Sequence, residues 1–367
     1  MPEMKVSPPR LNRPWLFEAF PGLREQLPWT PLVEAPTPVH RLERVSAQLR
    51  KEVWIKRDDK TSSEYGGNKA RKLEFLLGEA LAQDRKRVFT GGGLGTNHGL
   101  ATTIFGKKLG FHVRLGLFDQ PVTAHVRNNL LLYQAFGAEM KYAGSALKAA
   151  LRYYLFEKIR QRRAYLIPLG GSSPLGALGY VDAGLEFAAQ VQRKEAPLPQ
   201  MIFAALGTCG TVAGLVLGLR LSGLATPVVG VQVAPGAFAN PKAVLRLAQK
   251  ALKLMQCLDR SVPRVQLTLE DFPVEREHYG PGYGHPTPAC REAIQVMGES
   301  EEIFLDPTYT GKTFGALLAR AKSEHEEGPV LFWNTLSSVN LDSVAQGVDF
   351  RSLPVAFHRF FECELTE

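Results

Sequence analysis

Short apolar segments rich in β-branched or aromatic residues alternate along this chain with turns and amphipathic helical stretches. Six such segments are predicted to be strands: residues 87–90, 112–118, 164–167, 200–205, 227–233 and 329–333. This alternation is typical of an α/β fold built on an open, mostly parallel sheet. In such folds ligands bind at the carboxyl ends of the strands, so the residues that follow each strand are the first candidates for function.

Three of the predicted strands end in turns rich in glycine and hydroxyl residues. The turns read TGGGLGTNH at 90–98, PLGGSS at 168–173 and ALGTCGT at 205–211. Backbone N–H groups in such turns point outward and attract anions. Together the three turns predict one shared, anion-lined cleft.

The composition fits a globular enzyme. With 367 residues, 45% of them hydrophobic, the chain is long enough to bury a sizeable core. The four cysteines, Cys209, Cys257, Cys290 and Cys363, lack the close pairing of zinc sites and redox dithiols, which fits a reducing compartment. No window resembles a signal peptide or approaches the roughly 20 apolar residues of a membrane span. We therefore expect a cytoplasmic protein without a metal ion and without a membrane partner.

A formal net charge of +8 raises the question of nucleic-acid binding. The basic runs at 85–87 and 158–163 lie at the ends of helical patterns, where cations complement the helix dipole and stay solvated. This distribution favours a solvated surface with some general attraction for small anionic substrates. Nucleic acid is not an expected partner.

Lys69 is predicted to lie at the start of a helix. It follows Gly66 and Gly67, which permit a tight turn, and apolar residues repeat at helical spacing after it in NKARKLEFLL. A cation at a helix start opposes the helix dipole, so the position needs an anionic partner or loss of the charge. A neutral, desolvated lysine is the nucleophile that an aldehyde cofactor requires. A surface lysine in a Gly-Asn turn is the alternative on this segment alone.

The turn GTCGT at 207–211 opens another predicted helix and offers successive N–H groups and hydroxyls at its positive end. This pattern predicts a phosphate-binding loop. It lacks the Gly-Lys-Ser/Thr ending of a nucleoside-triphosphate loop and the spacing of a dinucleotide fingerprint, so a single phosphate is favoured. A purely structural tight turn is the alternative.

Six motifs in order, GGNKARKLE, GTNHGLAT, PLGGSSPLGALGY, GTCGTVAGL, GPGYGHPT and LDPTYTGKTFGAL, resemble the D-cysteine desulfhydrase and 1-aminocyclopropane-1-carboxylate (ACC) deaminase family of pyridoxal-phosphate enzymes. The match runs from about Pro38 to Leu336. The resemblance implies two open, mostly parallel three-layer sheets, the tryptophan synthase β-like fold (fold type II). It further implies a large cofactor domain at 1–71 and 185–367, a small inserted domain at 72–184, and a homodimer.

The resemblance also implies the site residues. Lys69 corresponds to the lysine that holds the cofactor covalently, Thr96 stands where the family usually has a serine facing the substrate, and two tyrosines complete the catalytic set. The catalytic residues are thus Lys69, Thr96, Tyr283 and Tyr309, and the cofactor contacts are Lys69, Asn68, Lys72, Asn97, Gly207, Thr208, Cys209, Gly210, Thr211 and Thr310. Ordinary packing is the alternative reading for the tyrosines, and a small filler role is favoured for Cys209 over a nucleophilic one.

Thr310 corresponds to the residue that faces the pyridine nitrogen. A neutral hydroxyl leaves that nitrogen unprotonated more often than a carboxylate would, and members that open the cyclopropane ring carry Glu here. Elimination tolerates the weaker electron sink, so we expect D-cysteine to be converted to pyruvate, sulfide and ammonia. ACC deamination or another small amino-acid lyase reaction is the near alternative. The second alternative is a catalytically weak relative that binds the cofactor, because GTN at 95–97 and NTLS at 334–337 depart from the family pattern.

Overall fold

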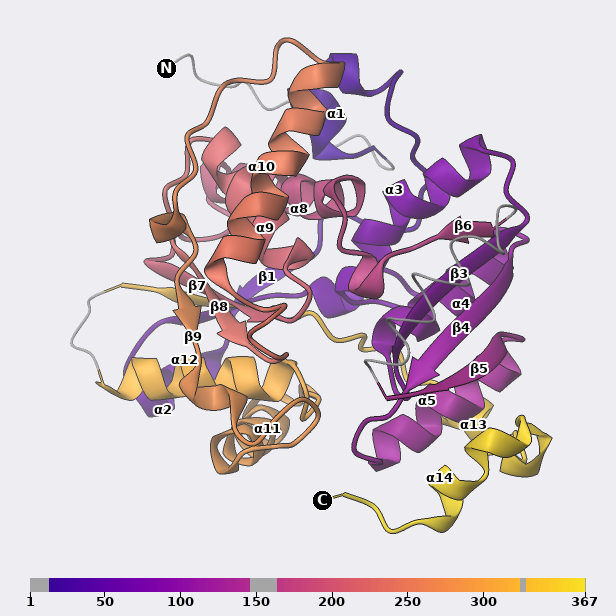
Figure 1. Ribbon diagram of the computed structural model, residues 1–367. Helices are drawn as coiled ribbons and strands as arrows, with labels where there is room; N and C mark the ends of the chain where they lie inside the picture. Colours follow the sequence, from indigo (N-terminus) through magenta and orange to yellow (C-terminus); the bar gives the residue numbers. More distant parts are fainter. Residues whose placement is uncertain (1–12, 146–163, 324–327, 367) are drawn as a thin grey trace. The chain divides into compact units, whose positions relative to one another are not determined.

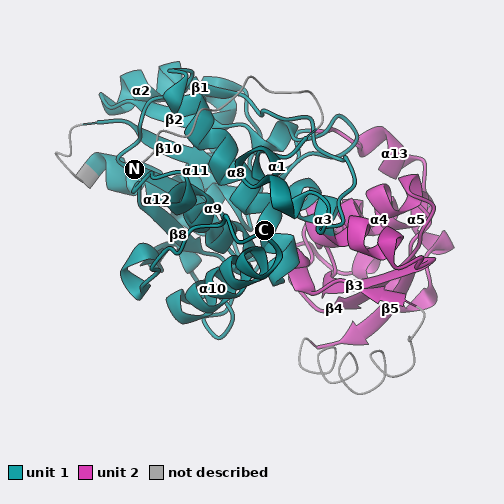
Figure 2. Ribbon diagram, turned by 90° about the horizontal axis from the view of Figure 1, so that it is seen from above, with its two compact units in different colours: residues 1–75, 172–338 teal, residues 76–171, 339–367 magenta. Residues whose placement is uncertain are grey.

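The computed structural model describes residues 13–145, 164–323 and 328–366. The chain divides into two compact units, Met1–Phe75 with Ser172–Ser338, and Leu76–Gly171 with Val339–Glu367, here called the first and second unit (Figure 2). The predicted fold class, with two open and mostly parallel sheets flanked by helices, is confirmed. The boundaries between the units lie elsewhere than the sequence suggested, at 75/76 and 171/172 instead of 71/72 and 184/185.

The first unit is built on a six-stranded sheet with the order β1-β2-β10-β7-β8-β9. Its strands are β1 (Val39–Arg41), β2 (Val53–Lys56), β7 (Met201–Leu206), β8 (Val228–Gln232), β9 (Val274–Glu275) and β10 (Val330–Trp333). Strand β1 runs antiparallel to β2, and the other neighbouring pairs are parallel. The turns that follow the parallel strands therefore share one edge of the sheet.

Successive side chains of the central strands point into two separate hydrophobic cores. In β10, Leu331 and Trp333 join one buried cluster, whereas Val330 and Phe332 join another. The first cluster is closed by α1 (Trp15–Ala19), α8 (Pro174–Gln192), α9 (Gly210–Leu221) and α10 (Pro241–Leu258), and the second by α2 (Glu43–Leu49), α11 (Pro288–Glu301) and α12 (Thr310–Ser323). Because successive strand residues point to opposite faces, a sheet covered on both sides needs a continuous apolar run such as VLFW.

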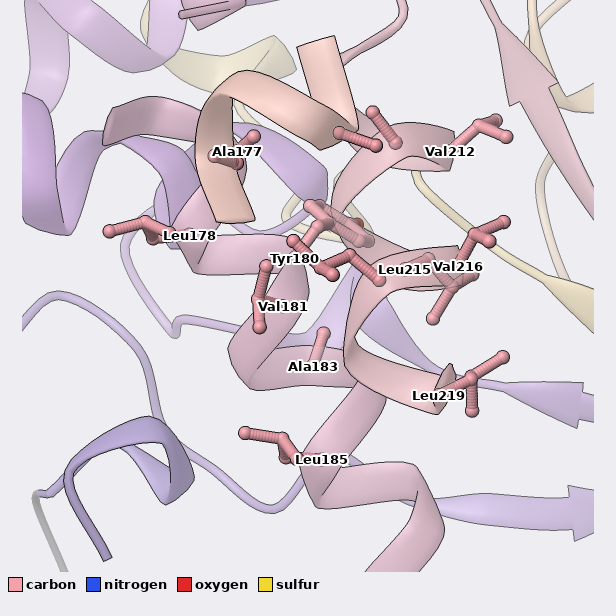
Figure 3. Packing of buried hydrophobic residues seen from close by; sticks show 14 of the residues in the cluster. Ala177, Leu178, Tyr180, Val181, Ala183, Leu185, Val212, Leu215, Val216 and Leu219 are labelled. Atoms are coloured by element: carbon pink, nitrogen blue, oxygen red, sulfur yellow. The ribbon is translucent and has the colours of Figure 1, made fainter. Parts of the chain in front are cut away.

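Helix α8 packs tightly because glycines lie at its contacts. A Cβ added to Gly214 of α9 would come within 2.3 Å of the Ala177 carbonyl oxygen of α8. Figure 3 shows apolar side chains of the two helices, among them Tyr180 of α8 and Leu215 of α9. In α8 itself, a Cβ on Gly179 would lie 2.1 Å from the carbonyl oxygen of Arg71 in α3 (Asn68–Ala82). The first turns of α3 and α9 therefore both pack closely against α8.

Arg71 of α3 belongs to a buried network of charged side chains. Arg71 pairs with Asp58 at 2.8 Å and with Glu186 at 2.9 Å, and Glu186 also pairs with Lys56. Two cations and two carboxylates balance, as buried charges must. Burial alone would raise the pKa of Glu186, but the charges of Arg71 and Lys56 lower it to about 2. Further hydrogen bonds come from Thr37, Tyr180 and Trp333.

The second unit contains a four-stranded parallel sheet with the order β5-β4-β3-β6 (Figure 1). Its strands are β3 (Arg87–Gly93), β4 (His112–Phe118), β5 (Glu139–Gly144) and β6 (Ala164–Leu166), and its helices include α4 (Asn97–Lys108), α5 (Ala124–Ala135), α13 (Asp342–Gln346) and α14 (Arg359–Glu362). Short 3₁₀ turns complete the two units at Pro21–Leu23, Asp58–Lys60, Leu169–Gly171, Leu269–Asp271, Glu277–Tyr279, Phe350–Ser352 and Val355–Phe357.

The C-terminal stretch packs within the second unit, whereas the sequence-based division grouped it with the large domain. Arg127 of α5 donates a hydrogen bond to the Phe360 carbonyl at 2.8 Å, and the rings of Tyr142 and Phe360 lie 5.7 Å apart. These contacts tie the stretch to the four-stranded sheet and its helix. No local pattern in the sequence encodes such a distant attachment.

All six predicted strands are present within a few residues of their predicted bounds. Of the two basic runs, Lys86 and Arg87 are exposed, in agreement with the solvated surface expected, and the run at 158–163 lies outside the described residues. The four cysteines are free thiols. Across the described residues, no helix combines the length and apolarity that a membrane span requires.

The N-terminal segment packs onto the first unit through backbone amides that donate to buried carboxyls. The Leu16 amide donates to Asp182 at 2.8 Å, and the amides of Leu32 and Val33 donate to Glu74 at 3.0 and 3.1 Å. Burial raises the pKa of Glu74 to about 8 and that of Asp182 to about 7, against these amide hydrogen bonds. Below about pH 7 both carboxyls are therefore mostly neutral in the folded chain.

The raised pKa of Glu74 predicts that the free energy of unfolding depends on pH. Between the ordinary pKa of 4.5 and the folded value of about 8, folded Glu74 keeps a proton that the unfolded chain releases. The free energy of unfolding therefore falls as pH rises through this window. Glu74→Gln keeps an acceptor oxygen and does not titrate, so its unfolding midpoint should fall less between about pH 5 and pH 8 than that of the wild type. Exposed Glu25→Gln is the control, and a Glu74→Gln slope equal to the wild type would contradict the prediction.

Candidate active site

Lys69 lies in the first turn of α3, and its approach depends on Gly67. Gly67 has φ +89°, and a Cβ there would come within 2.7 Å of the Thr335 carbonyl oxygen. The next residue, Asn68, donates its backbone N–H to the same carbonyl at 3.1 Å. Only glycine permits this conformation at so short a distance. The predicted tight turn and helix start are confirmed.

The Lys69 amine has the electrostatics of a nucleophile. Burial lowers its pKa to about 8, while the negative charge of Asp306 opposes the shift. The pKa of Lys72, one turn later, is lowered well below its ordinary value, first by burial and then by the charge of Lys69. Desolvation favours the neutral amine, which is the form that attacks a carbonyl.

The Gly207–Thr211 loop connects β7 to α9 and is held in place by hydroxyls. Cys209 adopts φ 70°, an uncommon conformation for a residue with a side chain. Ser172 Oγ lies 2.7 Å from Thr208 Oγ1 and accepts from the Gly210 amide at 3.2 Å. The loop thus directs the first amides of a buried helix, whose dipole favours an anion.

The loop and the start of α3 lie side by side. Asn68 Nδ2 donates to Thr211 Oγ1 at 3.0 Å, and a Cβ on Gly210 would come within 3.1 Å of Lys72 Nζ. The Cys209 thiol donates to a backbone carbonyl, that of Phe238, and burial raises its pKa, which agrees with a filler role. The structure therefore brings together Lys69, Asn68, Lys72 and the loop residues 207–211.

The two predicted tyrosines are in contact. Their hydroxyl oxygens lie 2.5 Å apart, and their rings meet edge to face at 6.0 Å. A Cβ on Gly207 would lie 3.7 Å from the Tyr309 ring, so this pair borders the Gly207–Thr211 loop. Burial raises the pKa of Tyr283, with the Tyr309 hydroxyl opposing it, so the Tyr283 phenol stays protonated at neutral pH.

Sequence reasoning missed Lys312, which anchors the loop of Tyr283. Its buried ammonium donates to the carbonyl oxygens of Tyr279 and Gly282, at 2.6 and 3.1 Å. The residue stands in the YTGKT motif, two positions after Thr310. The signal in the sequence was a lysine within the largely apolar helical stretch TGKTFGALL.

Sequence reasoning also missed Asp306, the carboxylate that organises the start of α12. Its Oδ1 accepts from the amides of Thr308 and Tyr309 at 2.9 and 2.7 Å, and its Oδ2 accepts from the Thr310 hydroxyl at 2.7 Å. Both Asp306 and Thr310 are buried. An Asp before Pro-Thr-Tyr-Thr at a helix start is a capping pattern, and that signal was available in the sequence.

Thr96 and Asn97 lie in the second unit, at the start of α4. Thr96 Oγ1 accepts from the Gly99 amide at 3.3 Å and caps the helix. Asn97 Oδ1 lies 2.9 Å from His125 Nε2 and accepts from Asn129 Nδ2 at 3.1 Å. The side-chain oxygen of Asn97 is thereby engaged within its own unit, so a further acceptor would bind at its amide nitrogen.

The chemistry of the first-unit residues fits a phosphorylated aldehyde cofactor. The loop amides, the hydroxyls of Thr208 and Thr211, and Lys72 together suit one phosphate, and Lys69 supplies an amine with a lowered pKa. Among the described residues, no group of three or more His, Cys, Asp or Glu side chains gathers as metal ligands.

Comparisons with known proteins agree with this chemistry. A family model described as pyridoxal-phosphate dependent enzyme matches residues 31–335. The D-cysteine desulfhydrase of Serratia proteamaculans is 35% identical over 320 residues, which cover 84% of this chain and 94% of that protein. The crystal structure of an ACC deaminase homologue has a TM-score of 0.75 and 30% identity, covering 88% of this chain and 95% of that one. A hydrogen sulfide-producing enzyme from Fusobacterium nucleatum, 14% identical with a TM-score of 0.56 over 83% of this chain and 95% of its own, shares the fold.

Proposed function

This chain belongs to the family of pyridoxal-phosphate-dependent enzymes, and from that premise we propose that it catalyses an α,β-elimination that converts D-cysteine to pyruvate, sulfide and ammonia. The observation that carries the proposal is the contact between the start of α3, with Lys69, and the Gly207–Thr211 loop, made by Asn68 and Thr211 at 3.0 Å. The identity to a D-cysteine desulfhydrase over nearly the whole length of that protein supports the choice of substrate.

Each proposed site residue has a physical task. Pyridoxal phosphate, when bound, supplies an electron-accepting ring conjugated to the substrate's amino group. Lys72 and the loop residues 207–211 bind the phosphate, and Asn68 supports them from α3. Lys69 would hold the cofactor covalently, and its amine, neutral when desolvated, would take the α-proton of the substrate.

The remaining proposed residues would contact the substrate and the polar atoms of the cofactor ring. We assign Thr96 to the substrate carboxylate and Asn97 to the phenolic oxygen of the cofactor. Tyr283 and Tyr309, whose hydroxyls share a hydrogen bond, flank the reacting carbon atoms. Thr310 faces the pyridine nitrogen. These assignments follow the family resemblance, residue by residue.

The decisive experiment records the visible spectrum of the purified protein and then adds D-cysteine while sulfide and pyruvate are assayed. Equal amounts of both products are expected, with L-cysteine, D-serine, β-chloroalanine and ACC as comparison substrates. A keto acid from ACC without sulfide from D-cysteine would reject the desulfhydrase assignment in favour of a deaminase, which the likeness to the ACC deaminase homologue makes the second candidate. Cofactor colour without product from any amino acid would indicate a catalytically weak relative.

We further propose that the protein is a cytoplasmic homodimer that takes a small amino acid as its substrate. Light scattering of the purified holoenzyme measures the assembly directly. A mass equal to one chain of 40.5 kDa would reject the dimer without affecting the proposed reaction.

A further inference from the structure

We propose that Gln120 is a substrate-binding residue, which donates a hydrogen bond from its side-chain nitrogen to the carboxylate of the amino-acid substrate, beside Thr96. The inference rests on the proposed function, in which Thr96 binds that carboxylate. It adds a residue from a neighbouring strand end, and it makes Gln120 a determinant of the preference for amino acids over amines that lack the carboxylate.

Gln120 and Thr96 follow two neighbouring strands of the four-stranded sheet. Strand β3 ends at Gly93 and β4 ends at Phe118, and these two residues are partners in the parallel register. Gln120 comes after Asp119, directly past the end of β4. Parallel strands present their carboxyl ends at one edge, where α/β sheets bind ligands. Both side chains are therefore placed to meet the same ligand.

The backbone fixes which end of the Gln120 carboxamide is left for a ligand. The Gly95 N–H donates to Gln120 Oε1 at 3.2 Å. A backbone N–H can only donate, so the oxygen faces Gly95 and the nitrogen is turned to another partner. Gln120 is half-buried, and across the residues that the structure describes its Nε2 has no hydrogen-bond partner. A donor of this kind suits an acceptor that a ligand brings.

Glycines make room for the carboxamide. A Cβ on Gly93 would lie 2.1 Å from Gln120 Oε1. A Cβ on Gly95 would lie 3.4 Å from Gln120 Nε2 and 2.9 Å from Val126 Cγ2. The carboxamide therefore borders the space in which a side chain of residue 95 would begin, one residue before Thr96. The GTN turn lacks a side chain of its own at this point, and Gln120 places a donor there from the neighbouring strand.

The backbone carbonyls of the turn are already engaged within the second unit. Asn129 Nδ2 donates to the Gly95 carbonyl at 2.8 Å, and the Tyr133 hydroxyl donates to the Thr96 carbonyl at 2.9 Å. These bonds hold the turn in place. Thr96 Oγ1 accepts from the first turn of α4, and a hydroxyl that accepts still has its proton to donate. Thr96 and Gln120 thus offer two neighbouring donors, which suit the two oxygens of a carboxylate.

The carboxylate next to Gln120 in the sequence is paired elsewhere. Asp119 Oδ1 accepts from the Tyr142 hydroxyl at 2.5 Å and lies 3.6 Å from Arg359 Nη2. The cation compensates the charge of Asp119, so this carboxylate opposes an anionic group at Gln120 little.

The test measures binding of two ligands that differ only in the carboxylate. Holoenzyme is titrated with D-alanine, which has no leaving group on its β-carbon, and with ethylamine, and the change in visible absorbance gives each dissociation constant. Gln120→Glu keeps an oxygen for the Gly95 amide and puts a negative oxygen in place of Nε2. Because a hydrogen bond to a charged group is lost, the dissociation constant of D-alanine should rise about 10-fold or more. That of ethylamine should stay the same or fall, and the KM for D-cysteine should rise.

Two further variants make the result specific. Gln120→Met keeps the length of the side chain and removes both polar atoms, so it should weaken D-alanine binding less than Gln120→Glu does. Gln83→Glu introduces the same charge at an exposed position before β3, at the opposite edge of the sheet, and should leave both dissociation constants unchanged. Thermal unfolding and the affinity for pyridoxal phosphate confirm that each variant is folded and loaded.

The outcomes separate this inference from the proposed function. A merely structural role of Gln120 would weaken D-alanine and ethylamine alike, and that result overturns the inference. An unchanged KM for D-cysteine in Gln120→Glu, or unchanged D-alanine binding in both Gln120 variants, overturns it too, while sulfide and pyruvate from D-cysteine leave the proposed function standing. A wild type that neither responds to D-alanine nor forms sulfide from D-cysteine rejects the proposed function and the inference with it.

Discussion

Lys69→Ala is expected to remove the visible absorbance of the bound cofactor and to abolish the adduct that borohydride reduction forms on the wild type. The reason lies in the amine itself, because burial lowers its pKa to about 8 and provides the neutral nucleophile at moderate pH. Lys69 is also proposed to take the α-proton. Since positioned acid–base catalysis contributes about 10²–10⁴-fold, we expect kcat to fall by at least about 10³-fold.

Two neighbouring lysines make this experiment specific. Lys60→Ala, at an exposed position of the same unit, should keep both the absorbance and the activity. Lys72→Ala should bind the cofactor more weakly and still form the adduct, because the Lys72 amine lies against the Gly207–Thr211 loop at Gly210, where we propose that the phosphate binds. Peptide mapping of the reduced wild type locates the attachment. An adduct on Lys72 or Lys56 in place of Lys69 would refute the assignment.

The parts of the fold that the sequence predicts are those that local chemistry encodes. A strand covered on both faces must be apolar throughout, so VLFW at β10 and IFAAL within β7 stand out. Gly67 marks the turn before Lys69 because its positive φ excludes other residues. Strands β1 and β9 escape notice because they have three and two residues at the sheet edges, and β5 because charged residues interrupt it.

The parts that the sequence hides depend on pairings far apart in the chain. Lys56 and Glu186 are separated by 130 residues, and neither reveals from its neighbours that it is buried with a partner. Asp306 is different, because it accepts a hydrogen bond from Thr310, only four residues away, and such a local capping pattern can be recognised in the sequence.

The second large effect is expected from Gly179→Ala, a change of one methyl group in α8. That methyl would lie 2.1 Å from the Arg71 carbonyl oxygen, so α3 must move away from α8. Overpacking of this kind costs roughly 1–3 kcal/mol of unfolding free energy. The larger consequence concerns the site, because Arg71 stands between Lys69 and Lys72 and is fixed by its ion pairs with Asp58 and Glu186. We expect the affinity for pyridoxal phosphate to fall together with the stability.

Gly298→Ala is the matched control for this experiment. Gly298 is an exposed glycine within α11, and a Cβ there meets nothing within 4 Å. Its replacement should raise the unfolding free energy by roughly 0.5–1 kcal/mol, because alanine loses less backbone freedom on folding than glycine. Denaturant unfolding and cofactor titration of both variants measure the two effects. If Gly179→Ala binds the cofactor as tightly as Gly298→Ala does, then the close approach of α8 to α3 does not set the position of Lys69, and the site must be held from the side of the Gly207–Thr211 loop.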